Sequence, residues 1–423
     1  MKDFLNKFSL VFQDKILRKR IFFTLGALVV FRALAAIPIP GVDHGRLAQF
    51  FSSNEFFGLL NVFSGGGLSQ LSIVMLGVGP YITGSIIMQL LTIMSPKLKE
   101  MYQEEGDAGR RKFAQYGRLL TIPLALIQGF GFIKLLQSQQ VLPHLAGFTL
   151  VTNLLVITAG SILLMWIGEL ISEYGIGNGV SLIIFSGIVA ALPTTVSQLI
   201  FSFDIAQLPL YIVFAVVAMI VIVGVVIITE AERPIPVTYA KQVRGTRVFG
   251  GTSTYLPLRI NQAGVIPIIF ALSLLLFPQM IVRFLQNVNN ATVKAVSTFV
   301  LNLLANSWFY AIAYFILVFI FTYFYTAVTF DPDQISTNLQ KNGAFIPGVR
   351  PGKSTSDHIA RILTRLTLVG ALFLGVIAVL PLVMKGLTGI TAVSIGGTAL
   401  LIVVSVVIDL IKKIDAQVSI REY

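Results

Sequence analysis

Residues that could do chemistry are few in this sequence. The chain has no cysteine, and its three histidines, His44, His144 and His358, lie far apart along it. This spacing matches neither a metal site nor a nucleophile with a partner base. The string GIGNG at 175–179 resembles part of a nucleotide-binding fingerprint, but no predicted strand precedes it, so a turn between helices is the better interpretation. We therefore expect no catalytic residue, no metal ion and no cofactor.

The elements that must position any functional residue are strongly apolar. Of the 423 residues, 55% are hydrophobic and only 12% are charged, about half the charged fraction of a soluble domain. Long apolar runs favour an all-α integral membrane protein over a membrane barrel. No short apolar region with a small-residue cleavage site follows the cationic first twenty residues, so no removable signal peptide is expected.

Ten apolar segments approach the roughly 20 residues that cross a bilayer. They are 21–37, 71–94, 119–136, 151–171, 180–200, 210–229, 262–283, 307–328, 366–384 and 390–411. We expect a cytoplasmic N-terminal segment (1–20), an N-terminal half (21–200), a C-terminal half (201–411) and a cytoplasmic tail (412–423). Because each half has five spans, the two halves would enter the membrane from opposite sides, as inverted repeats do.

The basic residues predict the orientation. Of 31 Lys and Arg, 25 fall in the N-terminal segment, the loops 95–118, 230–261 and 329–365, and the tail after Leu410. All these segments lie on one face of a ten-span chain, which the positive-inside rule makes cytoplasmic together with both termini. The same rule accounts for the net charge of +12, so no direct DNA binding is expected.

Charged side chains are nearly absent from the predicted spans. Arg32 and Arg283 lie near the outer ends of their spans, and Glu169 and Glu173 at the inner end of the fourth. Ion pumps and coupled transporters bury such groups near the midplane. The polar residues within or at the ends of the spans are neutral: Thr83, Ser85, Gln89, Gln128, Asn261, Gln262 and Ser273. Ordinary hydrogen bonding between helices would explain them, and such a lining would also suit a cargo that must not be held tightly.

Three further segments are unusual for a membrane protein. A glycine triplet at 65–67 separates an apolar piece too short to cross a bilayer from the second predicted span, which suggests a re-entrant or packed half-helix. The loop 230–261 alternates β-forming and basic residues and predicts a protruding hairpin. The loop 329–365 carries two Pro-Gly turns, at 347 and 351. Docking of a large partner and a plain positive-inside excess both remain open for these loops.

Seven strings, in order, carry a family resemblance. NVFSGGGLSQLSI, GPYITGSIIMQLL, GIGNGVSLIIFSGIVA, PVTYAKQVRG, NQAGVIPIIFA, FIPGVRPG and GGTALLIVVSVVIDL resemble the bacterial SecY family of Sec translocase channel subunits over essentially the whole chain. The resemblance implies ten transmembrane helices in two pseudo-symmetric inverted halves around a central pore, with a hinge between spans five and six. It also implies a lateral gate towards lipid, between spans two and three and spans seven and eight.

The resemblance assigns roles to particular residues. A pore ring would comprise Val78, Ile82, Ile184, Ile188, Ile269 and Ile402, with Val78 where relatives often have Ile. The plug half-helix at about 57–67 would include Phe57, Leu59, Leu60, Val62, Phe63, Gly65, Gly66 and Gly67. The lateral gate would carry Thr83, Gln128, Asn261 and Ser273. Lys241, Arg244, Arg247 and Arg350 would dock the SecA motor or the ribosome, although Thr246 interrupts a basic run that is denser in relatives.

The implied activity is passive conduction of unfolded preproteins, with lateral release of transmembrane segments into lipid. The expected partners are the SecE and SecG subunits, the SecA ATPase, the ribosome, preproteins bearing signal sequences, and membrane lipid. The chain would reside in the cell membrane and would not be an enzyme. A small-solute secondary transporter and an assembly scaffold are the alternative interpretations of ten spans.

Overall fold

The structure is a computed structural model. It describes residues 14–39, 64, 66–68, 70–138, 141–143, 147–201, 208–240, 242–244, 247–249, 251, 253–285, 290–388 and 396–419.

A helix overlaps each of the ten predicted spans. The helices are α2 (Lys15–Ala35), α5 (Gly79–Met94), α7 (Gly106–Ser138), α8 (Phe148–Tyr174), α9 (Gly179–Phe201), α10 (Leu208–Glu230), α11 (Ile266–Leu285), α13 (Ser307–Thr329), α15 (Lys353–Thr388) and α16 (Gly396–Ser419). Within the described residues, five stretches are long and apolar enough to cross a membrane: Gly106–Gln137, Phe148–Tyr174, Tyr211–Glu230, Ser307–Lys341 and Lys353–Met384. The chain is therefore a multi-pass membrane protein.

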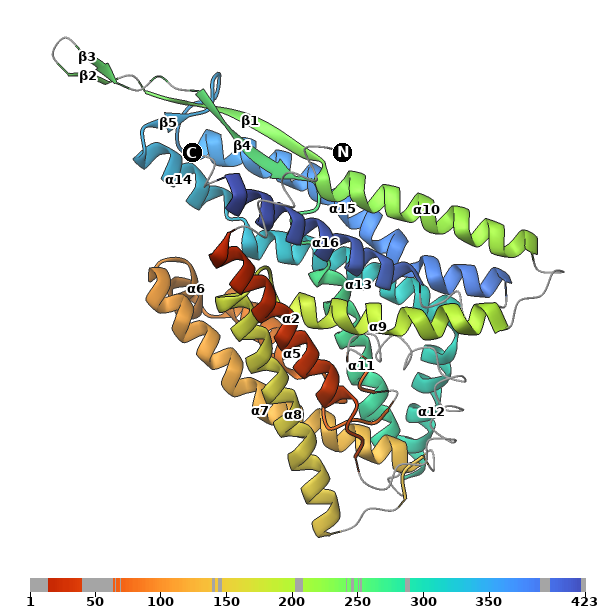
Figure 1. The fold of residues 1–423 in the computed structure, drawn as a ribbon. Coiled ribbons are helices and arrows are strands. Elements are labelled where there is room, and N and C mark those ends of the chain that lie inside the picture. The colour runs from red at the N-terminus through yellow and green to blue at the C-terminus, as the bar shows by residue number, and fades with distance from the viewer. Residues whose placement is uncertain are drawn as a thin grey trace.

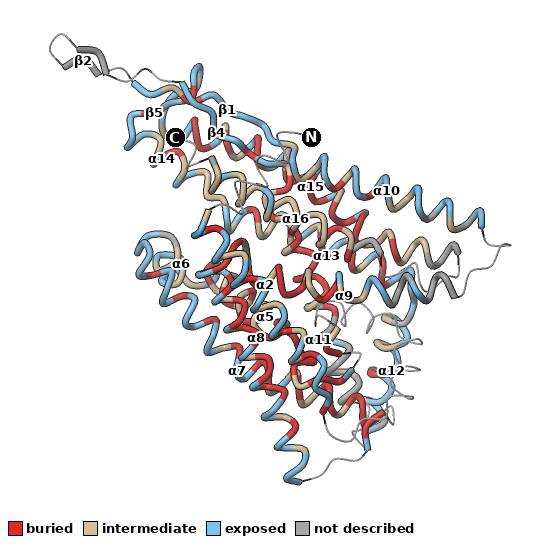
Figure 2. Tube along the Cα trace, in the orientation of Figure 1, coloured by how far each residue is buried: buried red, intermediate tan, exposed pale blue. Residues whose placement is uncertain are grey.

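The helices pack as two groups. Helices α2, α5, α7, α8 and α9 contact one another, and so do α10, α11, α13, α15 and α16 (Figure 1). The groups meet where α11 contacts α5 and α7, and where α9 contacts α16. Figure 2 shows buried residues along the faces where helices meet, whereas α10 is exposed along most of its length. An apolar helix with so little buried surface is suited to lipid.

The second predicted span begins later than the sequence suggested. Residues 71–78 form turns rather than the first two turns of a helix, and α5 starts at Gly79. Ile39 N donates to Leu71 O at 2.8 Å and Ile73 N donates to Ile37 O at 3.0 Å, so this backbone pairs with the chain after α2. Gly77 adopts φ +58°, a conformation that favours glycine and interrupts a helix.

The predicted hairpin is confirmed. Strand β1 (Glu232–Tyr239) pairs antiparallel with β4 (Ser253–Arg259), and β2 (Gln242–Arg244) pairs with β3 (Arg247–Phe249) beyond them. The short strand β5 (Ala344–Phe345) joins the other edge of β1, which gives the order β4-β1-β5. Figure 1 shows this hairpin projecting from one end of the helix bundle.

A small apolar core unites the two long loops. Ile235, Val237 and Leu258 of the hairpin pack with Ile346 and with Ile359 at the start of α15. The loop 329–365 is thus largely ordered, because it contains α14 (Pro332–Lys341), β5 and the first turns of α15.

Three helices fall where the sequence analysis expected loops or turns. They are α6 (Pro96–Gln103), α12 (Ala291–Ala305) and α14. Asp331 and Pro332 are the cap and first residue of α14, a standard start signal. Asn290 caps α12 in the same way, since its side chain accepts from Thr292 N.

Candidate functional site

The predicted ring residues share one apolar cluster at the centre of the molecule. Val78, Ile184, Ile188, Ile269 and Ile402 are all buried in it, and Ile82 packs against it. They come from α5 and its N-cap, from α9, from α11 and from α16, so both helix groups contribute. Each ring helix offers an aliphatic side chain, and none offers a charge. An aliphatic cluster of this kind makes weak, non-directional contacts and excludes water.

A cavity of about 530 Å³ adjoins this cluster. Part of its wall is apolar and consists of Ile82, Val180, Ile184, Val265, Ile266, Ile269 and Phe270. Polar side chains from α5, α7, α8, α9 and the residue before α9 form the rest. These polar residues are Tyr81, Ser85, Gln89, Arg118, Glu169, Ser172, Glu173, Asn178 and Ser181. The wall of this cavity, which we call the vestibule, is therefore part apolar and part polar.

An ion pair that the sequence analysis missed lies in the vestibule wall. Arg118 Nε lies 2.6 Å from Glu169 Oε1, which joins α7 to α8. Both side chains are partly exposed, so the pair contributes little to stability, about 0–1 kcal/mol. It nevertheless neutralises two charges beside an apolar constriction. The sequence signal was only that both residues lie at the same ends of apolar helices.

The predicted gate residues are brought together only in part. Gln128 Nε2 on α7 donates to Thr83 Oγ1 on α5 at 3.4 Å, a long hydrogen bond. Asn261 Nδ2 donates instead to Gly264 O within its own loop, at 3.3 Å. Ser273 lies half-buried on α11. The described geometry therefore joins Thr83 to Gln128, while α11 contacts both of their helices.

The predicted plug can be followed only at its end. Phe57, Leu59, Leu60, Val62, Phe63 and Gly65 lie outside the described residues. Gly66 adopts φ +82°, and a Cβ on Gly67 would lie 2.8 Å from Ser72 Oγ. The backbone of Gly66 therefore favours glycine, and a side chain at Gly67 would be closely packed.

Of the predicted docking residues, Arg350 is described best. It is exposed in the turn after β5, and Thr355 Oγ1 donates to its carbonyl oxygen at 2.9 Å. Ser336 Oγ donates to Gly352 O at 2.7 Å, which ties the same turn to α14. Arg350 is therefore presented on a braced loop.

Of the other three docking residues, two can be placed on the backbone of the hairpin. Arg244 and Arg247 pair across β2 and β3, and their side chains are outside the described part of the chain. Lys241 lies outside the described residues altogether.

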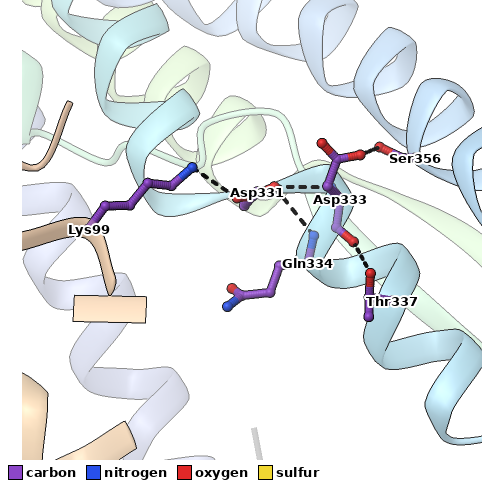
Figure 3. Close-up of polar contacts among 6 residues, drawn as sticks. All are labelled: Lys99, Asp331, Asp333, Gln334, Thr337 and Ser356. Atoms are coloured by element: carbon purple, nitrogen blue, oxygen red, sulfur yellow. Dashed lines mark hydrogen bonds and ion pairs between the residues drawn. The ribbon is translucent and has the colours of Figure 1, made fainter. Parts of the chain in front are cut away.

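A polar network surrounds the start of α14 (Figure 3). Asp331 Oδ1 accepts from Asp333 N at 3.0 Å and from Gln334 N at 3.3 Å, and Asp331 Oδ2 lies 3.8 Å from Lys99 Nζ on α6. Ser356 Oγ of α15 donates to Asp333 Oδ1. Because α6 lies between α5 and α7 in sequence whereas Asp331 follows α13, the Lys99 contact crosses from one helix group to the other.

Comparisons with known proteins identify relatives over nearly the full length. The SecY family model matches residues 72–411. The chain is 43% identical to the protein translocase subunit SecY of Corynebacterium glutamicum over 441 residues, which covers 97% of each protein. It is 41% identical to the protein translocase subunit SecY of Streptomyces coelicolor over 436 residues, which covers 99% of each.

Solved structures share the fold. One described as a protein-conducting channel gives a TM-score of 0.66 at 19% identity, over 96% of this chain and 93% of that one. A SecY structure described in terms of a plug domain that stabilises the closed channel gives 0.65 at 20% identity, over 97% and 94%. Sec61 in a canine ribosome–channel complex gives 0.62 at 18% identity, over 96% and 93%.

Proposed function

The chain belongs to the SecY family of protein translocase subunits, and we propose that it conducts unfolded preproteins across the cell membrane. As the channel subunit of a Sec translocon, it moves polypeptide passively and releases transmembrane segments sideways into lipid. The observation that carries this proposal is the apolar cluster of Val78, Ile184, Ile188, Ile269 and Ile402, which adjoins a vestibule of mixed polar and apolar lining.

The cluster is suited to a polypeptide pore rather than to a small-solute site. A translocating chain presents every type of side chain in turn, so a lining that binds one of them strongly would stall it. Ile82, Ile184 and Ile269 offer only weak, adaptable contacts in the vestibule wall. The ring closes the resting pore, and the segment 57–67 adds a plug on the external side.

The lateral gate is the seam where α11 meets α5 and α7. Thr83 and Gln128, which share a hydrogen bond, line the α5–α7 side of this seam, and Asn261 and Ser273 belong to the α11 side. An arriving signal helix parts the seam and replaces the contacts along it. The α9–α16 contact on the other side joins the two halves near the hinge. Because the gate contacts are weak, they can be replaced by apolar contacts with a signal sequence.

The end that carries the hairpin faces the cytoplasm. This orientation rests on the excess of Lys and Arg in the loops and termini. The partner that supplies energy, which is the SecA motor or the ribosome, docks on Arg350, Lys241, Arg244 and Arg247. SecE and SecG complete the membrane complex.

A crosslinking experiment tests the proposal. The native chain lacks cysteine, so single cysteines at Ile82, Ile188, Ile269 and Ile402 can report contacts with a stalled precursor against a clean background. We expect each to crosslink, and a cysteine at the exposed Ile220 of α10 to give no product. A precursor that crosslinks at Ile220 but at none of the four ring positions would overturn the proposal.

A further inference from the structure

Helix α12 divides its surface into three sectors. Val293, Val300, Leu301 and Leu304 are half-buried, and Ser297 is buried, so this sector faces the protein. At about 100° per residue, a second sector contains Val296, Phe299 and Leu303, which are 62%, 67% and 37% exposed, with the exposed Thr292 at its N-terminal end. A third sector contains the exposed polar residues Lys294, Thr298 and Asn302. The two exposed sectors therefore differ in chemistry.

The helix that follows α12 carries an exposed apolar row of its own. Helix α12 contacts both α11 and α13. Directly after it, α13 starts with the exposed Trp308, and Ile312, Ile316 and Ile320 continue along one exposed face at spacings of four residues. On a membrane-spanning helix, such a row faces lipid, and a tryptophan at its end is typical of the membrane–water interface. Leu303 of α12 is only five residues from Trp308.

The position of α12 fits the same surface. Figure 1 shows α12 at the end of the bundle away from the β1–β4 hairpin. A helix of 15 residues is about 22 Å long. One sector of this helix is apolar, one is polar and the third packs against protein. Such a helix is stable at the boundary between lipid and water.

We propose that α12 is an interfacial helix and that Val296, Phe299 and Leu303 insert into the outer boundary of the lipid bilayer. Lys294, Thr298 and Asn302 then face the water and the headgroups. Since α12 contacts α11 and α13, the lipid holds that edge of the C-terminal half in place. The inference rests on the membrane location of the chain and does not depend on any role of the pore.

Fluorescence quenching tests this placement in the complete channel complex, reconstituted into vesicles of phosphatidylethanolamine and phosphatidylglycerol. Single cysteines replace Val296, Phe299 or Leu303, and matched controls replace Lys294, Thr298 or Asn302. Each carries a small fluorophore. The quenchers are a lipid with a nitroxide high on its acyl chain and aqueous iodide.

We expect the nitroxide lipid to quench the apolar trio at least threefold more than the polar trio, and iodide to show the reverse order. Equal access of iodide to both trios would place α12 in water and overturn the proposal. Protection of the apolar trio from both quenchers would show that protein covers it, and would also overturn the proposal. Because six positions are compared, one variant that fails to fold leaves the result readable. Precursor crosslinking to the ring is a separate measurement, so either proposal can fail alone.

Discussion

Gly160 is the position where α8 lies directly against the backbone of the turns before α5. A Cβ added to Gly160 would overlap the carbonyl oxygen of Ile73, and a backbone atom cannot move aside as a flexible side chain can. Overpacking of this kind costs about 1–3 kcal/mol. We expect Gly160→Ala to lower the thermal unfolding midpoint of the detergent-solubilised protein, measured by intrinsic fluorescence.

The matched control for Gly160 is Gly26→Ala in α2. Nothing lies within 4 Å of a Cβ built on Gly26, and alanine favours a helix more than glycine does. The control should therefore leave the midpoint unchanged or raise it slightly. Equal losses in the two variants would mean that α8 does not pack as described.

Single residues of the site were predictable in type but not in pairing. The i,i+4 spacing of Ile184 and Ile188 places both on one helix face, yet only the family resemblance distinguished the pore from lipid or core. Arg118 and Glu169 lie 51 residues apart, so local sequence carried no sign of their contact. Asn261 matched the family motif but bonds within its own loop.

Elements were predictable where apolar length alone decides them. All ten predicted spans contain a helix, and the alternating β-formers of the loop 230–261 predicted the hairpin. The predicted start of the second span was wrong, because hydropathy carries no information about backbone hydrogen bonds. Residues 71 and 73 bond to the segment after α2 instead of forming helical bonds. Helix α12 was missed because its apolar residues divide between the protein-facing sector and the exposed apolar sector, which weakens a simple periodic signal.

The N-terminal cap of α14 gives a prediction about the gate. Asp331 both caps α14 and contacts Lys99 of the other helix group. Asparagine caps a helix about as well as aspartate does, so Asp331→Asn removes only the ion pair. An exposed pair is worth about 0–1 kcal/mol, which corresponds to an increase in spontaneously open gates of up to about fivefold. Spin labels on α6 and α14 would measure the open population, because open gates add a second, longer distance between the two labels.

Further variants separate the two roles of Asp331. Asp331→Ala should also lose the cap, at a cost of about 0.5–2 kcal/mol. Lys97→Ala removes a positive charge two residues from Lys99 on α6, on the opposite face of that helix, and should change neither the stability nor the open population. High salt should reduce the difference between Asp331→Asn and the native chain, because it screens exposed charges. An open population in Asp331→Asn equal to the native one, at low salt, would show that the pair does not hold the gate.

The braced turn after β5 gives a second prediction for an element. Thr355 and Ser336 fix the backbone around Arg350, whose side chain is exposed. Arg350→Glu should therefore reverse a charge on an intact surface, and weaken binding of SecA or the ribosome at least tenfold. Binding to channel-containing vesicles would measure it. The matched charge reversal is Lys294→Glu, at the opposite end of the bundle, and this variant should bind SecA or the ribosome normally. If the two variants bind equally well, Arg350 has no part in docking.

At the scale of the whole molecule, the resting seal depends on apolar side chains from both helix groups meeting in one cluster. Ile188 is 4% exposed in that cluster, and Val189, the next residue of α9, is 39% exposed. A polar side chain at Ile188 stabilises water in the constriction, which an aliphatic ring excludes. We expect Ile188→Asn to raise the resting ion conductance of the channel in planar bilayers severalfold, and Val189→Asn to leave it near the native level. The two positions are adjacent on α9 and lie at nearly the same depth, so the comparison separates the ring-facing position from the exposed one. A native-like conductance for Ile188→Asn, with the protein folded and inserted, would mean that the seal lies elsewhere along the pore.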